Sequence, residues 1–384
     1  MRFEFATATR IIFGQGSINE VAPLAAKLGQ RALLVTGKNP ERGQGLFAQL
    51  REQRIDVHLF QVPGEPTTSL ALEGVQVARR IGCDLVIGLG GGSVLDTGKV
   101  IAALLTNSGE LMDYLEIIGR GQPLTRPAAP YIAIPTTAGT GAEVACNAVL
   151  ISPEHRVKIS MRSPLMMARL AVVDPTLTYS LPPAITASSG LDALTQLIEP
   201  FVSCQANPLT DSLCREGMQR VARSLRRACE DGSSQESRED MALASLFSGL
   251  ALANARLGAV HGLAGPLGGM IAAPHGVICA RLLPLVMEAN VAACKSRAPS
   301  ATALARYDEV AKILTGKAAA KAADGILWVS ELCTALGLPR LGEFGLTEDN
   351  LPEAVDKAQR ASSMKGNPIT LTAKELTAIL RKVL

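Results

Sequence analysis

The chain has 384 residues, of which 47% are apolar and 19% charged, so it can build the cores of two domains and is not disordered. Its 38 basic and 35 acidic side chains are interspersed, and a formal net charge of +3 excludes the basic surface that nucleic-acid binding requires. Aromatic residues make up only 3%, too few for base stacking, and no Lys/Arg run indicates a membrane surface.

Strand-like and helical segments alternate in the first half of the chain, which predicts βαβ units and a parallel sheet. The segment 145–161 differs, because two apolar runs flank Pro153-Glu154. It predicts an antiparallel hairpin on the edge of that sheet. The expected strands are 31–36, 56–61, 84–88 and 130–134, and the expected helices between them are 44–53 and 69–81.

Strand-like runs disappear after Pro182-Pro183, and the apolar periodicity becomes helical. We therefore expect an α/β dinucleotide-binding domain at 1–182 and an all-helical metal and substrate domain at 183–384. Residues 230–240 are polar and predict a loop between two helices. The expected helices of the second half are 209–229, 241–255, 303–315, 319–336 and 374–383.

The longest segment without a charged residue is 257–280, but its six glycines and two prolines are not those of a lipid-exposed helix. We expect it to form buried helices and loops around a site. The eight cysteines are scattered without a CxxC pair, which is typical of reduced thiols in a reducing compartment. The N-terminus shows no apolar signal segment. These observations predict a cytoplasmic protein without a membrane partner.

A glycine-rich turn follows the strand predicted at 84–88, in the sequence DLVIGLGGGSVLDTGK. Glycines let the backbone approach a ligand, and the free N–H groups at the start of the next helix favour an anion. The sequence is neither a P-loop nor an ordinary GxGxxG turn. It predicts a phosphate or pyrophosphate site at Gly90, Gly91, Gly92 and Ser93, with a ligand-free tight turn as the alternative.

A second loop of the same kind, IPTTAGTGAEV, follows the next strand. Thr136, Thr137 and Thr140 supply hydroxyl groups there. Two such loops at neighbouring strand ends fit a dinucleotide at the carboxyl edge of an open sheet.

Asp192 and Gln196 are four residues apart, and on a helix they would share one face. His261 and His275 are the only histidines after residue 155. An isolated His in so apolar a segment is more often a hydrogen-bonded core residue than a ligand. One Asp with two His would nevertheless form a set that suits Fe(II) or Zn(II) with open positions for a substrate.

Six ordered motifs together resemble the iron-containing (group III) alcohol dehydrogenase family, over essentially the whole chain. They are GGGSVLDTGK, IPTTAGTGAEV, VVDPTLTYSLP, SGLDALTQLIEP, VHGLAGPLGG and APHGV, and the ending SSMKGNPITLTAKEL also matches. The resemblance implies a fold similar to that of dehydroquinate synthase, with an α/β dinucleotide domain and a helical domain.

The resemblance also implies roles for individual residues. Asp192, His261 and His275 match metal ligands that carry the catalysis, and Gly90–Ser93 match the pyrophosphate loop. The other residues assigned to the cofactor are Asp96, Thr136, Thr137, Thr140 and Lys158, the last near the nicotinamide half.

The sequence departs from the family pattern at two positions. Gln196 occupies the place of a fourth His ligand, and Gly265 the place of a further His near the nicotinamide. A neutral amide oxygen is a weaker donor than imidazole, which predicts looser metal binding or a water beside Gln196.

Gly37 and Lys38 follow the first predicted strand, where family members that prefer NAD often carry an Asp in place of Gly37. Without that carboxylate, a 2′-phosphate is not repelled, and Lys38 or Arg42 can pair with it. We therefore expect NADP to be used at least as well as NAD.

These residues predict an NAD(P)-dependent, metal-dependent alcohol dehydrogenase or aldehyde reductase, with a small alcohol or aldehyde as substrate and a homodimer as the assembly. Other readings stay open, because the fold alone does not fix the function. They are a sister activity such as a polyol dehydrogenase or the synthase itself, a metal-free reductase, and a cofactor-binding protein without catalysis.

Overall fold

The computed structural model describes residues 2–384, and the chain divides into two compact units. The unit called here the α/β unit comprises Ala6–Thr137 and Gly141–Tyr179. The helical unit comprises Ser180–Leu384, together with Ala138–Thr140 and the described residues up to Phe5. Residues 138–140 therefore leave the α/β unit within the second predicted loop and contribute to the helical unit.

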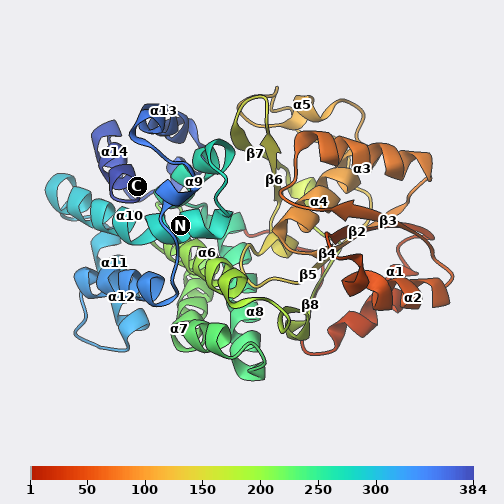
Figure 1. Ribbon diagram of the computed structural model, residues 1–384, viewed down its shortest axis with the longest axis horizontal. Helices are drawn as coiled ribbons and strands as arrows, with labels where there is room; N and C mark the ends of the chain where they lie inside the picture. Colours follow the sequence, from red (N-terminus) through yellow and green to blue (C-terminus); the bar gives the residue numbers. More distant parts are fainter. Residues whose placement is uncertain (1) are drawn as a thin grey trace. The chain divides into compact units, whose positions relative to one another are not determined.

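The α/β unit contains a six-stranded parallel sheet in the order β1-β8-β5-β4-β2-β3 (Figure 1). The four predicted strands are confirmed. The central strands β4 and β5 are buried along their whole length, which explains their uninterrupted apolar sequences. Strands β1 and β8 were not predicted, because three or four residues carry too little periodicity. The strands are β1 (Ile11–Phe13), β2 (Arg31–Gly37), β3 (Asp56–Val62), β4 (Leu85–Gly90), β5 (Tyr131–Pro135) and β8 (Leu170–Val173).

The predicted hairpin is antiparallel, as expected, but its predicted place on the edge of the main sheet is wrong. Strands β6 (Asn147–Ser152) and β7 (Val157–Arg162) form a separate two-stranded sheet, and the edge strands of the main sheet are β1 and β3. Helix α4 holds this hairpin. Asp96 on α4 accepts a hydrogen bond from the backbone N–H of Val149 (2.9 Å), and Lys99 donates to the carbonyl of Asn147.

Helices connect the parallel strands of the α/β unit. The two helices predicted there, 44–53 and 69–81, are confirmed as α2 and α3. Helix α3 begins after Thr67, whose hydroxyl accepts the N–H of Leu70 (3.1 Å) as an N-cap. The helices are α1 (Val21–Ala25), α2 (Gln44–Glu52), α3 (Thr68–Arg80), α4 (Gly92–Thr106) and α5 (Leu111–Tyr114).

The helical unit contains helices packed around one apolar core. The predicted helices of the second half are found, with boundaries shifted by a few residues. The helices are α6 (Pro183–Val202), α7 (Pro208–Glu230), α8 (Gln235–Ala255), α9 (Ala259–Met270), α10 (His275–Arg297), α11 (Thr302–Thr315), α12 (Ala322–Ala335), α13 (Leu351–Arg360) and α14 (Ala373–Arg381).

The loop predicted at 230–240 is wrong in its second half, because α8 already begins at Gln235. Two of its charged residues, Arg238 and Asp240, are buried rather than solvated. Arg238 is only 2% exposed and donates to the hydroxyl of Thr186 on α6 (2.9 Å), while Asp240 accepts from Arg220 and Arg223 on α7. Polarity alone therefore gave a false loop signal, because hydrogen bonds satisfy Arg238 and ion pairs satisfy Asp240.

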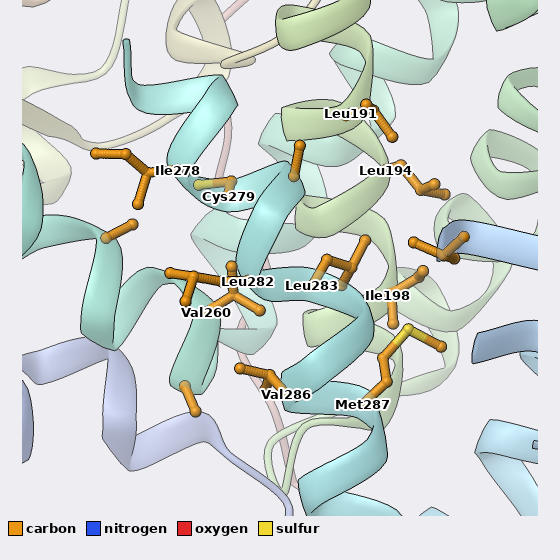
Figure 2. Packing of buried hydrophobic residues seen from close by; sticks show 14 of the residues in the cluster. Leu191, Leu194, Ile198, Val260, Ile278, Cys279, Leu282, Leu283, Val286 and Met287 are labelled. Carbon is orange, nitrogen blue, oxygen red and sulfur yellow. The ribbon is translucent and has the colours of Figure 1, made fainter. Parts of the chain in front are cut away.

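The uncharged segment 257–280 forms α9 and the start of α10, which confirms the expectation of buried helices. Helix α10 is long and apolar enough to cross a membrane by length and composition, but 67% of its most apolar window is buried in the protein. The bent pair α8 and α9 passes the same test only if both helices count as one span. Figure 2 shows the packing that explains this apolarity: Leu282, Leu283 and Val286 of α10 lie among side chains of α6 and α9.

Candidate active site

Three helices of the helical unit bring together four side chains of the types that can bind a metal ion. Asp192 lies on α6, His261 on α9, and His275 and Cys279 on α10. One donor atom from each of them lies within 4.8 Å of all the others. Oδ1 of Asp192 is 3.5 Å from Nε2 of His261 and 3.8 Å from Nε2 of His275. The three predicted catalytic side chains therefore converge on one point, although they come from distant parts of the sequence.

Close contact between α6 and α10 places His275 beside Asp192. Gly276 follows His275 in the first turn of α10, and a Cβ atom built there would lie 2.3 Å from the backbone carbonyl oxygen of Ser188. Ser188 precedes Asp192 by about one helical turn. Only a residue without a side chain lets the two backbones approach this closely.

Side chains from distant segments hold the beginning of α9, whose N-cap Gly258 has no side chain to cap it. Oδ1 of Asn367 accepts the N–H of Ala259 (3.0 Å), and Oε1 of Glu199 on α6 accepts the N–H of Val260 (2.7 Å). These bonds satisfy two of the free N–H groups of the first turn. They fix the position of His261, the next residue.

Glu199 also fixes the orientation of the His261 ring. Its Oε2 lies 2.6 Å from Nδ1 of His261, in a site where both side chains are more than nine-tenths buried. We assign the Nδ1 proton to this hydrogen bond, with the carboxylate as acceptor. Nε2 is then the atom that His261 presents to Asp192 and Cys279, as in histidines that ligate a metal through Nε2 and donate through Nδ1 to a carboxylate.

The buried cluster carries strong electrostatic interactions. Burial raises the pKa of Asp192, but its contact with His261 and the charge of His275 outweigh burial and lower that pKa to about 2. Burial lowers the pKa of His261, but Cys279, Glu199 and Asp192 outweigh it and raise that pKa well above its ordinary value. Burial raises the pKa of the Cys279 thiol to about 12. The cluster therefore attracts positive charge, either a proton or a metal cation.

Sequence reasoning missed two residues of this site. Glu199 lies seven residues after Asp192 and thus on the same face of α6, a spacing that was available as a signal. Cys279 is fully buried, and its sequence context alone does not distinguish it from a core residue. Its position one turn after His275 on α10, however, brings its Sγ to 3.6 Å from Nε2 of that histidine.

In the α/β unit, the two predicted cofactor loops follow paired strands. Gly90 at the end of β4 lies opposite Pro135 at the end of β5, and Thr136 donates its N–H to the carbonyl of Gly90 (3.0 Å). A Cβ at Gly91 would lie 3.3 Å from Cγ2 of Thr137, so the loops are also in contact. Helix α4 begins at Gly92, with Ser93 in its first turn.

Both halves of the chain match models of one protein family. Residues 8–175 match the family described as "Iron-containing alcohol dehydrogenase", and residues 186–384 match "Fe-containing alcohol dehydrogenase family, C-terminal". The 1,3-propanediol dehydrogenase of Klebsiella pneumoniae is 35% identical to this chain, and the match covers 99% of this chain and 98% of that protein.

The chain belongs to the iron-containing alcohol dehydrogenase family. The expected resemblance and fold class are confirmed, and the chain is an oxidoreductase that acts on CH–OH groups. The crystal structure of a 1,3-propanediol oxidoreductase has a TM-score of 0.92 with this chain at 33% identity, with all of both chains covered. The structure of sulfoacetaldehyde reductase from Bifidobacterium kashiwanohense, in complex with NAD+, has a TM-score of 0.85 at 28% identity and covers 100% of this chain and 99% of that one.

Gln196 and Gly265 are the two positions where this alcohol dehydrogenase departs from the ligand pattern expected for its family. Gln196 is buried on α6 one turn after Asp192, and its Nε2 lies 3.5 Å from the carbonyl oxygen of Gly139. Among residues 2–384, no hydrogen-bond partner is found for its Oε1. Gly265 lies on α9 one turn after His261 and brings no side chain that could move a proton.

The remaining residues predicted to bind the cofactor occupy different parts of the enzyme. Asp96 forms an ion pair with Lys99 (3.0 Å), and Lys158 on β7 forms one with Glu65 (2.9 Å). Both ion pairs lie within the α/β unit. Thr140 belongs to the helical unit. Their roles in cofactor binding stay predictions.

The end of β2 carries the residues predicted to select NADP. Gly37 is the last residue of this strand, and the nearest described atom to a Cβ built there is Cγ2 of Val94, at 3.9 Å. Lys38 and Arg42 follow on the exposed surface. The strand end therefore offers space and two exposed positive charges, and it has no carboxylate at position 37.

Proposed function

We propose that this enzyme interconverts a small alcohol and its aldehyde or ketone by hydride transfer with NADP(H) or NAD(H), at a divalent metal held by Asp192, His261 and His275. Iron(II) is the metal that the family name suggests, and zinc(II) suits the same donors. The observation that carries this proposal is the convergence of these three side chains within 4.8 Å in a buried site.

The donor atoms fit a metal ion in two further respects. Asp192 is only 2% exposed, and its Oδ1 has no hydrogen-bond partner among residues 2–384. A buried carboxylate oxygen in that state is costly unless a cation compensates it. In addition, Glu199 leaves Nε2 of His261 directed at this oxygen (3.5 Å).

The metal would supply Lewis-acid stabilisation of the substrate oxygen, and the nicotinamide would give or accept hydride. The side chains of the protein hold and orient the groups that take part in these steps. Asp192 contributes a negative charge, and Glu199 holds His261 in one orientation. Since Gly265 carries no side chain, the proton of the alcohol cannot pass through that position, and we propose that cofactor ribose and water carry it.

The cofactor would bind with its pyrophosphate at Gly90, Gly91, Gly92 and Ser93. Free N–H groups at the start of α4 and the hydroxyls of Thr136 and Thr137 support this placement. The NAD+ in the related sulfoacetaldehyde reductase supports a nicotinamide cofactor. Lys38 and Arg42 favour a 2′-phosphate, and we therefore propose that NADPH is accepted at least as well as NADH.

The test combines metal analysis with one substitution. Enzyme purified without chelator should contain about one iron or zinc per chain and should oxidise NADPH with a panel of small aldehydes. His275→Ala should abolish turnover while NADPH still binds, because the cofactor loops lie in the other unit. Equal loss of turnover and NADPH binding would show that His275 is structural.

Two other functions give different results in the same test. A metal-free reductase would turn over NADPH after complete removal of metal by a chelator. A cofactor-binding protein without catalysis would bind NADPH and turn over none of the aldehydes. We further propose a homodimer in the cytoplasm, to be checked by light scattering and by fractionation of the source cells.

A further inference from the structure

Cys279 faces the proposed metal site although neither the family motifs nor the sequence pattern give it a role. It is fully buried on α10 (Figure 2). Its Sγ lies 3.6 Å from Nε2 of His275 and 3.7 Å from Nε2 of His261. It also belongs to the group whose donor atoms all lie within 4.8 Å of one another, together with Asp192.

These distances match the edges of a tetrahedral coordination site. With zinc bonds of about 2.3 Å to sulfur and about 2.0–2.1 Å to nitrogen or oxygen, tetrahedral angles give S···N edges of about 3.5 Å and N···O edges of about 3.3 Å. The two S···N distances, 3.6 and 3.7 Å, differ little from the first value. The distances from Oδ1 of Asp192 to the two histidines, 3.5 and 3.8 Å, require a contraction of only a few tenths of an ångström.

One buried oxygen at this site provides an independent indication of a cation. Oδ1 of Asp192 has no hydrogen-bond partner among the described residues, and the side chain is more than nine-tenths buried. Of the two candidates for a fourth ligand, Gln196 offers a neutral amide. Cys279 offers a sulfur that becomes an anionic, strongly bound donor when it coordinates a metal.

We propose that Sγ of Cys279 is the fourth protein ligand of the metal. It replaces the fourth His ligand expected from the family pattern, whose place in the sequence Gln196 occupies. The protein ligands of the metal are thus one carboxylate, two imidazoles and one thiolate, and Gln196 stays outside the first coordination sphere. The substrate oxygen of the proposed function would then be a fifth ligand. This inference rests on the proposed metal site, and it replaces the expectation of loose metal binding by one of tight binding.

Cobalt(II) is the probe, because a thiolate ligand gives a near-ultraviolet charge-transfer band that oxygen and nitrogen ligands do not. Metal-free full-length enzyme is titrated with cobalt(II), as are Cys279→Ser, Cys279→Ala and Gln196→Ala. Cys294→Ala is the matched control, since Cys294 is a buried thiol on the same helix. The band should appear in the native chain, in Gln196→Ala and in Cys294→Ala, and it should be lost in both Cys279 variants with at least about a tenfold loss of cobalt affinity.

The outcomes separate this inference from the proposed function. Cobalt binding without the band in the native chain, or a band that survives in Cys279→Ala, overturns the thiolate ligand and leaves the metal site intact. Absence of any cobalt binding overturns both. If the Cys279 variants do not fold, zinc K-edge X-ray absorption of the native enzyme tests the thiolate ligand directly. One zinc–sulfur distance of about 2.3 Å is expected. A spectrum without this distance refutes the proposal.

Discussion

The two units assemble their candidate sites from different kinds of sequence information. In the α/β unit, Gly90 and Thr136 lie at the ends of paired strands and each belongs to a short continuous motif. In the helical unit, Asp192, His261 and His275 come from three helices. The first site depends on local backbone shape, whereas the second depends on how closely helices approach one another. Substitutions that change only one of these properties should therefore affect only one of the two sites.

The largest effect is expected for Gly276→Ala, which pushes α10 away from α6. The added Cβ would lie 2.3 Å from the carbonyl oxygen of Ser188, so His275 must move away from Asp192. Because a displacement of about 1 Å can cost on the order of 100-fold in rate, turnover should fall by about that factor. NADPH binding, measured by fluorescence titration, should not change.

The matched control is Gly45→Ala on α2, where a Cβ would meet no atom of the described residues within 4 Å. This variant should be as active as the native enzyme and slightly more stable, since Ala favours a helix over Gly by up to about 1 kcal/mol. Full activity of Gly276→Ala would disprove the close helix contact as the cause of the site geometry.

The second effect concerns Glu199→Gln, which keeps the shape of the side chain but removes its charge. The hydrogen bond to Nδ1 of His261 becomes weaker, and metal affinity should fall by about 10- to 100-fold, as for other partners of metal-ligating histidines. Metal titration with a competing chelator measures this loss. Glu348→Gln, at an exposed glutamate of the same unit, should leave the affinity unchanged. If both variants bind metal like the native chain, Glu199 does not orient the ligand.

A substitution in the α/β unit should produce the reverse pattern. A Cβ at Gly90 would lie 2.5 Å from Cγ2 of Val94, so Gly90→Ala must distort the turn that leads into α4. We expect about tenfold weaker NADPH binding with unchanged metal content. Gly90 lets the backbone of the turn approach the phosphate groups, and the methyl group of Ala would prevent this conformation. Isothermal titration with NADPH and metal analysis of the same sample test both halves of this expectation. Loss of metal in this variant would show that the sites are not independent.

The smallest effect is expected for cofactor preference at the end of β2. Gly37→Asp introduces a carboxylate that accepts from a ribose 2′-hydroxyl and repels a 2′-phosphate, so kcat/KM for NADPH relative to NADH should fall by about tenfold. Lys38→Ala should lower only the value for NADPH, by a few-fold, since exposed ion pairs contribute little. A native enzyme that strongly prefers NADH would refute the assignment of Lys38.

Much of the fold could be predicted because its elements have strong local signals. The apolar runs at 31–36 and 84–88 become strands buried on both faces, and the pattern at 69–81 becomes α3 with a Thr67 cap. The signals failed where tertiary contacts decide. Arg238 and Asp240 are polar enough for a loop, yet hydrogen bonds to Arg238 and ion pairs to Asp240 let both be buried within α8. The alternation in the hairpin, likewise, does not tell whether it joins the main sheet or forms a separate one.

The sequence by itself determined the parallel sheet, the helical second half, the glycine-rich turn before α4 and the identity of Asp192, His261 and His275 as candidate ligands. Each of these rests on spacing along one strand or helix, or on motifs in a fixed order. Only the tertiary structure decided that Glu199 orients His261 and that Cys279 faces the same point as the ligands. The physical reason is that both depend on the distance between packed helices, which Gly276 and the bonds at the start of α9 set and which no periodicity within one helix records.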